Sequence, residues 1–105
     1  MNGNKSLVHD ISSVLNNGNW GETEVVIAPP APLLALSREK FKTKIAISAQ
    51  NCSQEKSGAF TGETNADLLK DISVDWVILG HSERREIFKE SDQVRAFSLF
   101  CAVLF

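Results

Sequence analysis

The stretch VDWVILGHSERREIF, Val74 to Phe88, changes from apolar to charged within a few residues. Its first part is apolar from Trp76 to Leu79 and ends at Gly80, which His81 follows. Short, continuous apolar runs rich in Val and Ile are typical of strands in a parallel sheet that is covered on both faces. The charges that follow predict another turn or two of helix over Glu83–Lys89. The stretch therefore predicts a buried strand followed by a histidine at the start of a helix.

Two earlier apolar runs have the same character. EVVIAPP begins at Glu24 and is stopped by Pro29 and Pro30, and KIAISAQN begins at Lys44. Helix-like segments separate the runs: Ser6–Leu15 has apolar residues at helical spacing, Pro30–Leu36 is a short apolar segment opened by prolines, and Thr64 or Asn65 can cap ADLLKDI. Because strand and helix alternate, we expect an α/β fold with right-handed parallel crossovers.

Length and composition exclude several classes of protein. The 105 residues suffice for one small domain, and a hydrophobic content of 43% is typical of a globular chain. With 11 basic and 13 acidic residues, the chain has no basic surplus for nucleic acid and no polybasic cluster for an anionic membrane. The two cysteines make no disulfide framework. We therefore expect a cytoplasmic protein with reduced thiols that binds neither nucleic acid nor membranes.

No signal peptide opens the chain, because MNGNKSLVHD lacks an apolar core. The segment Ala96–Phe105 is nearly all apolar. It is only about half of the roughly 20 residues that cross a bilayer, so we do not interpret it as a membrane anchor.

The stretch CSQEKSGAFTGE, Cys52–Glu63, predicts an unusually long loop between a strand and the next helix. Loops of this length are uncommon unless they have a function. Phe60 lies near its tip, between Ala59 and Thr61. A lone exposed Phe needs no explanation, but a Phe at the tip of a glycine-bordered loop is a candidate for insertion into a partner.

His81 is the first candidate for chemistry. Ligands of α/β folds gather at the carboxyl ends of parallel strands, and His81, Asn51 and Pro29 each follow a predicted strand. At the start of a helical turn the helix dipole disfavours the imidazolium, and a neutral imidazole can donate a hydrogen bond to a carbonyl oxygen. Glu83 could bond to free backbone amides or pair with a cation. The alternative is that the histidine is structural or merely exposed.

The other polar groups give weaker signals. Arg84, Arg85 and Glu86 are most simply a charged helix face, in which each ion pair contributes little. The sequence GAFTGE does not fit a glycine-rich phosphate loop, and neither His9 nor His81 stands in a metal-ligand motif. From the residues alone we therefore expect no glycine-rich phosphate loop and no metal site.

Six motifs, MNGNK, APP, AQNCS, GAFTGE, LGHSERREIF and ESD, follow one another in this order along residues 1–93. In order and separation they resemble the triosephosphate isomerase family. The resemblance implies a partial (β/α)₈ TIM barrel of about three parallel strands with intervening helices over residues 1–93, and a divergent apolar tail over residues 94–105. It also implies a homodimer without cofactor or metal. The implied reaction interconverts dihydroxyacetone phosphate and glyceraldehyde 3-phosphate in glycolysis and gluconeogenesis.

The resemblance also assigns roles to individual residues. His81 matches the electrophile that polarises the substrate carbonyl, and this family is itself the standard example of a histidine kept neutral by a helix N-terminus. Glu83 matches a supporting acidic residue beside the active-site lysine. The dimer-interface residues that the resemblance implies are Asn51, Phe60, Thr61, Gly62, Arg84 and Glu90, of which Phe60 to Gly62 form the loop tip that enters the neighbouring subunit.

The chain also departs from the family pattern. In the family GGNWK directly precedes MNG, so we expect the 105 residues to lack the first strand and the substrate-binding lysine. From about Val94 the family continues with IGEKVAHAL or a similar sequence, whereas this chain reads VRAFSLFCAVLF, and the general-base glutamate has no counterpart. We therefore expect the 105 residues alone to be inactive. The alternatives are a non-catalytic fragment or truncated isoform that at most associates with full-length subunits, and a small open-sheet binding module.

Overall fold

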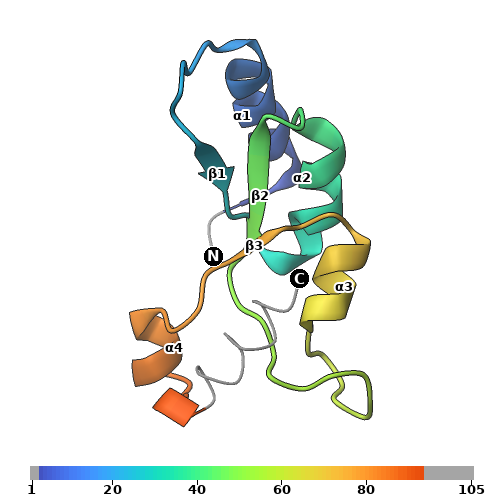
Figure 1. Ribbon diagram of the computed structural model, residues 1–105, viewed down its shortest axis with the longest axis vertical. Coiled ribbons are helices and arrows are strands. Elements are labelled where there is room, and N and C mark those ends of the chain that lie inside the picture. The colour runs from blue at the N-terminus through green and yellow to red at the C-terminus, as the bar shows by residue number, and fades with distance from the viewer. Residues whose placement is uncertain (1–2, 94–105) are drawn as a thin grey trace.

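The computed structural model describes residues 3–93 (Figure 1). The elements in chain order are α1 (Lys5–Asn17), β1 (Val25–Ile27), the 3₁₀ helix η1 (Ala31–Leu33), α2 (Leu34–Lys40), β2 (Ile45–Ala49), α3 (Ala66–Asp71), β3 (Trp76–Val77) and α4 (Ser82–Glu86). The strands form one sheet in the order β1-β2-β3, and both pairings are parallel. The predicted α/β fold is confirmed: three parallel strands with helices between them form an open part of a barrel.

The strand register separates the sheet into two different faces. Ile47 of β2 lies opposite Ile27 of β1, and Ala49 lies opposite Val77 of β3. These side chains belong to one apolar cluster with residues of α1, α2 and α3. The alternate positions include Val26 and Trp76, which are 36% and 45% exposed, and Ser48, which is 3% exposed. Within the described residues the second face is therefore covered only in part, and not fully as expected, since crossovers of one hand place their helices on one side.

The first helix begins and ends with recognisable caps. The side chain of Asn4 accepts a hydrogen bond from the amide of Leu7 at 2.8 Å, so α1 begins one residue earlier than the sequence predicts. Its other end is fixed by Trp20, whose indole donates to the carbonyl of Leu15 at 3.1 Å. A Cβ on Gly18 would lie 2.3 Å from the Trp20 ring, so only glycine fits there.

The second helix extends beyond the apolar segment from which it was predicted. Prolines open η1, and α2 then continues to Lys40, four residues past the predicted end. Arg38 closes this extension because its guanidinium donates to the carbonyls of Phe41, Lys42 and Ile45 at 2.8–3.2 Å. All three carbonyls lie after Lys40, so Arg38 ties the end of α2 to the segment that leads into β2.

The third strand is shorter than the predicted apolar run. Only Trp76 and Val77 pair as a strand, although the amide of Ile78 still donates to the carbonyl of Ala49 at 2.8 Å. The chain then turns at Gly80, whose φ of +69° is a backbone conformation that favours glycine. Figure 1 shows the 50–65 loop and α4 beyond the carboxyl ends of the strands, on opposite sides of the molecule.

Candidate active site

The position of His81 follows from the turn at Gly80. The residue is the N-cap of α4, and its carbonyl accepts the amide of Arg85 at 3.1 Å. The sequence predicts this helix over Glu83–Lys89, whereas the structure gives Ser82–Glu86. The left-handed φ of +58° at Lys89 is incompatible with continued helix, and this accounts for the shorter element.

The His81 ring contacts the helix that it caps. Its Nδ1 accepts a hydrogen bond from the amide of Glu83 at 3.3 Å. The Glu83 carboxylate lies farther away, at 3.7 Å from Nδ1, and its side chain is 72% exposed. A nitrogen that accepts an N–H bond has no proton of its own, so the neutral ring holds its proton on Nε2. The geometry therefore places an imidazole at the carboxyl end of β3, with Nε2 as the ring nitrogen that can donate.

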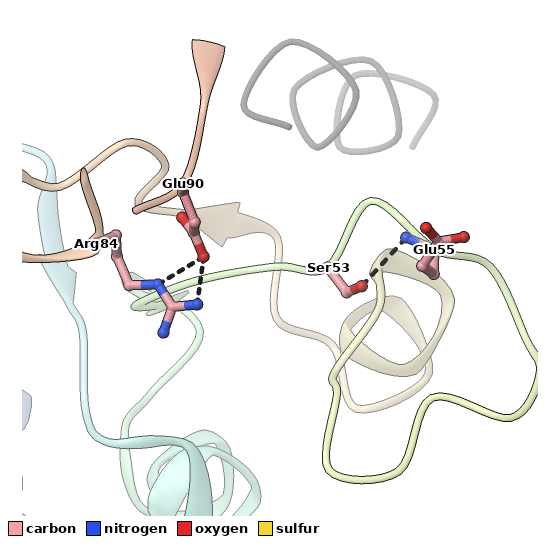
Figure 2. Close-up of polar contacts among 4 residues, drawn as sticks. All are labelled: Ser53, Glu55, Arg84 and Glu90. Carbon is pink, nitrogen blue, oxygen red and sulfur yellow. Dashed lines mark hydrogen bonds and ion pairs between the residues drawn. The ribbon is translucent and has the colours of Figure 1, made fainter. Parts of the chain in front are cut away.

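Arg84 and Glu90 form an ion pair at the other end of α4 (Figure 2). Arg84 Nε donates to Glu90 Oε1 at 2.8 Å, and a second guanidinium nitrogen contacts the same oxygen. The guanidinium also lies over the ring of Phe88, 4.5 Å from its centroid. The two charged side chains are only 29% and 16% exposed, which reduces screening of their attraction by water and salt.

The long loop is closed at its base. The amide of Ser53 donates to the carbonyl of Thr64 at 2.8 Å, and the Ser53 hydroxyl accepts the amide of Glu55 at 3.1 Å (Figure 2). A pocket of about 350 Å³ lies against the loop. Its lining residues are Ser53, Glu55, Lys56, Ser57, Gly58, Phe60, Glu63, Asn65, Asp67 and Leu68.

The tip of the loop is a tight turn that exposes an aromatic ring. The amide of Glu63 donates to the carbonyl of Phe60 at 3.0 Å, and Gly62 adopts a φ of +93° within this turn. Phe60 is 45% exposed, and Thr61 and Gly62 are exposed beside it. The sequence predicted both the loop and an accessible Phe60, and the structure confirms them as local features.

The predicted site residues fall into separate groups. His81 lies with Glu83, and Arg84 lies with Glu90. Within residues 3–93, no hydrogen bond or ion pair joins either group to the loop tip, and Asn51 is half-buried at the base of the loop. The same residues contain no group of three or more His, Cys, Asp or Glu side chains placed to hold a metal ion. No helix in this part of the chain is long and apolar enough to cross a bilayer.

Two contacts near the site were not predicted from the sequence. Phe88 was not singled out, although it stands four residues after Arg84, a spacing that brings side chains together on a helix. Gln50 was interpreted only as part of a strand end. Its side-chain amide donates to the carbonyl of Ala28 at 2.8 Å and thereby ties the ends of β1 and β2 together. A polar residue directly after a buried strand was the available signal.

A sequence model of the triosephosphate isomerase family matches residues 1–102 of the chain. This range reaches beyond Gln93, where the motif resemblance ends, and covers most of the 105 residues. It includes the three parallel strands, the His81 cap and the long loop. The parallel α/β architecture, the histidine at a strand end and the extent of the match agree, and the chain belongs to the triosephosphate isomerase family.

Proposed function

We propose that the chain supplies the carbonyl-polarising group of a triosephosphate isomerase site. The reaction would be the interconversion of dihydroxyacetone phosphate and glyceraldehyde 3-phosphate, in the cytoplasm, as part of glycolysis and gluconeogenesis. Family membership supports a triose phosphate as the substrate. In this proposal His81 is the electrophile, Glu83 supports it, and no cofactor or metal takes part.

The observation that carries the proposal is the bond from the Glu83 amide to His81 Nδ1. It leaves the N–H of the neutral ring on Nε2, on a side chain that is 52% exposed. A neutral N–H donor can polarise a carbonyl and stabilise the oxygen charge that develops when a neighbouring carbon loses a proton. Removal of that proton needs a separate base, because in this arrangement His81 acts on oxygen.

The state of the ring can be measured directly by ¹⁵N nuclear magnetic resonance. His9 provides an internal reference, because it is exposed on α1 and its ring makes no hydrogen bond within the described residues. At a pH where both rings are neutral, we expect His81 to show a more complete Nε2–H tautomer than His9. Glu83→Gln should preserve this difference, because it removes the carboxylate and keeps the backbone amide.

Two results would contradict the proposed role of the ring. One is an Nδ1–H tautomer at His81. The other is loss of the difference from His9 in Glu83→Gln, which would make the carboxylate at 3.7 Å the controlling partner instead of the amide.

We further propose that a polypeptide limited to these 105 residues has no isomerase activity above background. Its sequence has no counterpart of the family's general base, and general base catalysis contributes about 10²–10⁴-fold in rate. The test is turnover of glyceraldehyde 3-phosphate by the purified chain, with His81→Ala as the matched control. Turnover that His81→Ala abolishes would refute this part of the proposal.

A second candidate function is association with full-length subunits without catalysis. The closed loop with its exposed Phe60 favours this candidate, because an aromatic ring held at a loop tip is available to a partner at small entropic cost. By family resemblance the partner would be a triosephosphate isomerase subunit, as in a homodimer, and the contacts would include Asn51, Phe60, Thr61, Gly62, Arg84 and Glu90. The Phe60 and Thr61 variants described in the Discussion test this candidate.

A further inference from the structure

Helix α4, which carries His81 at its start, has almost no support from burial. The helix is five residues long, and none of its residues is buried. An isolated helix of this length is not stable in water, because nucleation costs more than so few hydrogen bonds return. Residues 87 and 88, directly after it, are 68% and 61% exposed. Contacts other than an apolar core must therefore hold α4 in place.

The ion pair between Arg84 and Glu90 ties α4 to the segment that follows it. The side chains meet through two guanidinium nitrogens on Oε1 of Glu90, and the amide of Glu90 donates to the carbonyl of Arg84 at 3.2 Å. A side-chain contact and a backbone contact therefore both join Arg84 to Glu90, six residues later in the chain. The Phe88 ring lies against the guanidinium inside this closure. We call Arg84, Phe88 and Glu90 the α4 clip.

The clip also holds a strained backbone position. Lys89 has a φ of +58°, a left-handed conformation that is unfavourable for a residue other than glycine. Such a conformation persists only where surrounding contacts determine it. Lys89 lies between Phe88 and Glu90, and the Arg84–Glu90 pair spans it. The left-handed turn at Lys89 and the Arg84–Glu90 pair therefore depend on each other.

The same helix sets the position of the histidine. The Glu83 amide lies in the first turn of α4, where it has no partner within the helix, and it donates to Nδ1 of His81. The amide of Ile87 donates to the carbonyl of Glu83 at 2.9 Å, and the amide of Arg85 donates to that of His81. When the C-terminal turn opens, these bonds weaken and the Nδ1 contact loses its fixed donor.

We propose that the α4 clip positions His81, by holding α4 in the form that fixes the imidazole and its tautomer. Arg84, Phe88 and Glu90 are positioning residues, since they act on the ring only through the helix. The importance of the clip for catalysis rests on the proposed function of His81, whereas its effect on the ring does not.

The proposal can be tested in the full 105-residue chain with the ¹⁵N signals of His81, referenced to His9. Glu90→Gln removes the charge at nearly constant size, and Arg84→Lys keeps the charge but loses the planar fork. We expect both variants to lose most of the difference between His81 and His9, and Phe88→Leu to lose less. The matched controls, Arg85→Lys and Glu86→Gln on the same helix, should leave the difference unchanged.

The amide signal of Leu7, bonded to Asn4 in α1, reports whether the rest of the fold persists. We expect it to be unchanged in every variant. An unchanged His81 signal in Glu90→Gln overturns the proposal, as does an equal effect of Glu86→Gln. Loss of the Leu7 signal in Glu90→Gln also overturns it, because the pair would then support the whole fold. A normal wild-type signal that Glu90→Gln does not change refutes the clip alone, whereas an Nδ1–H tautomer in the wild type refutes the proposed function.

Discussion

The scaffold, from α1 to β3, and the site segment, from His81 to Glu90, are stabilised in different ways. In the scaffold, Ile45, Ile47 and Leu69 are at most 1% exposed and belong to one apolar cluster. In α4 no residue is buried, and the contacts are an N-cap, an ion pair and a ring stacked on a guanidinium. Burial stabilises the part that sets the fold, and polar contacts orient the part that presents His81.

The two regions should respond differently to mutation. Apolar contacts are non-directional and add up over area, so they determine whether the sheet forms. Hydrogen bonds and ion pairs are directional, so they determine which atom of a side chain faces a substrate. A loss in the scaffold should therefore affect both regions, whereas a loss in the site segment should stay local.

The largest expected effect is that of Ile47→Ala. The side chain is 1% exposed in β2, between the helices and the neighbouring strands, so its truncation should cost about 2–5 kcal/mol of unfolding free energy. That is a large share of the roughly 5–15 kcal/mol by which small domains are stable. Urea unfolding followed by tryptophan fluorescence measures the loss. Val14→Ala is the control, because this side chain is 66% exposed on α1 and should change stability little.

Equal losses in Ile47→Ala and Val14→Ala would show that the cluster is not the stabilising core. Burial would then not distinguish the scaffold from the site segment.

A smaller effect is expected from Asn65→Ala at the start of α3. The Asn65 side chain accepts the amide of Leu68 at 3.0 Å, and loss of such a cap costs about 1 kcal/mol. The variant tests how much a polar contact contributes within the scaffold, because α3 is buried through Leu69 and yet begins with a side-chain cap. The same urea unfolding experiment applies. Asn65→Asp should restore most of the stability, since aspartate is an equally good cap; a loss as large as that of alanine would point to a different role for the residue.

Much of the scaffold could be predicted from the sequence because its signals are local. The apolar runs at Val25–Ile27 and Ile45–Ala49 are strands, and the two predicted cap positions of α3 included Asn65. The extension of α2 was missed because Ser37 to Lys40 are mostly polar. Their helix is completed by Arg38, which reaches carbonyls beyond its end, and periodicity does not register such a contact.

The site was predictable in its residues and less so in its contacts. His81 follows an apolar run and precedes charges, which places it at a strand end and a helix start, and the structure confirms that position. The pairing of Arg84 with Glu90 depends on the left-handed turn at Lys89, which no pattern of residue types predicted. The contacts of Asn16 were not predicted either. Its amide group bonds the carbonyl of Lys40 and the amide of Lys42 across the fold.

The smallest effect on folding is expected from changes at the loop tip. Such a small effect would distinguish the tip, as a surface for partners, from both the scaffold and the site segment. Phe60→Ala combined with Thr61→Ala removes exposed side chains and leaves the backbone bonds at Ser53–Thr64 and Phe60–Glu63 intact. Substitutions of this kind usually change the unfolding free energy by less than about 0.5 kcal/mol.

If the tip enters a full-length triosephosphate isomerase subunit, the same pair of substitutions should markedly weaken capture of that subunit in a pull-down, because buried aromatic anchors concentrate binding energy. Val14→Ala is the control for an exposed apolar side chain elsewhere, since Val14 is 66% exposed and lies on α1. Unchanged capture by the double variant, or equal loss in Val14→Ala, would remove the tip as the contact. A clear loss of unfolding free energy in the double variant would place the loop with the scaffold instead.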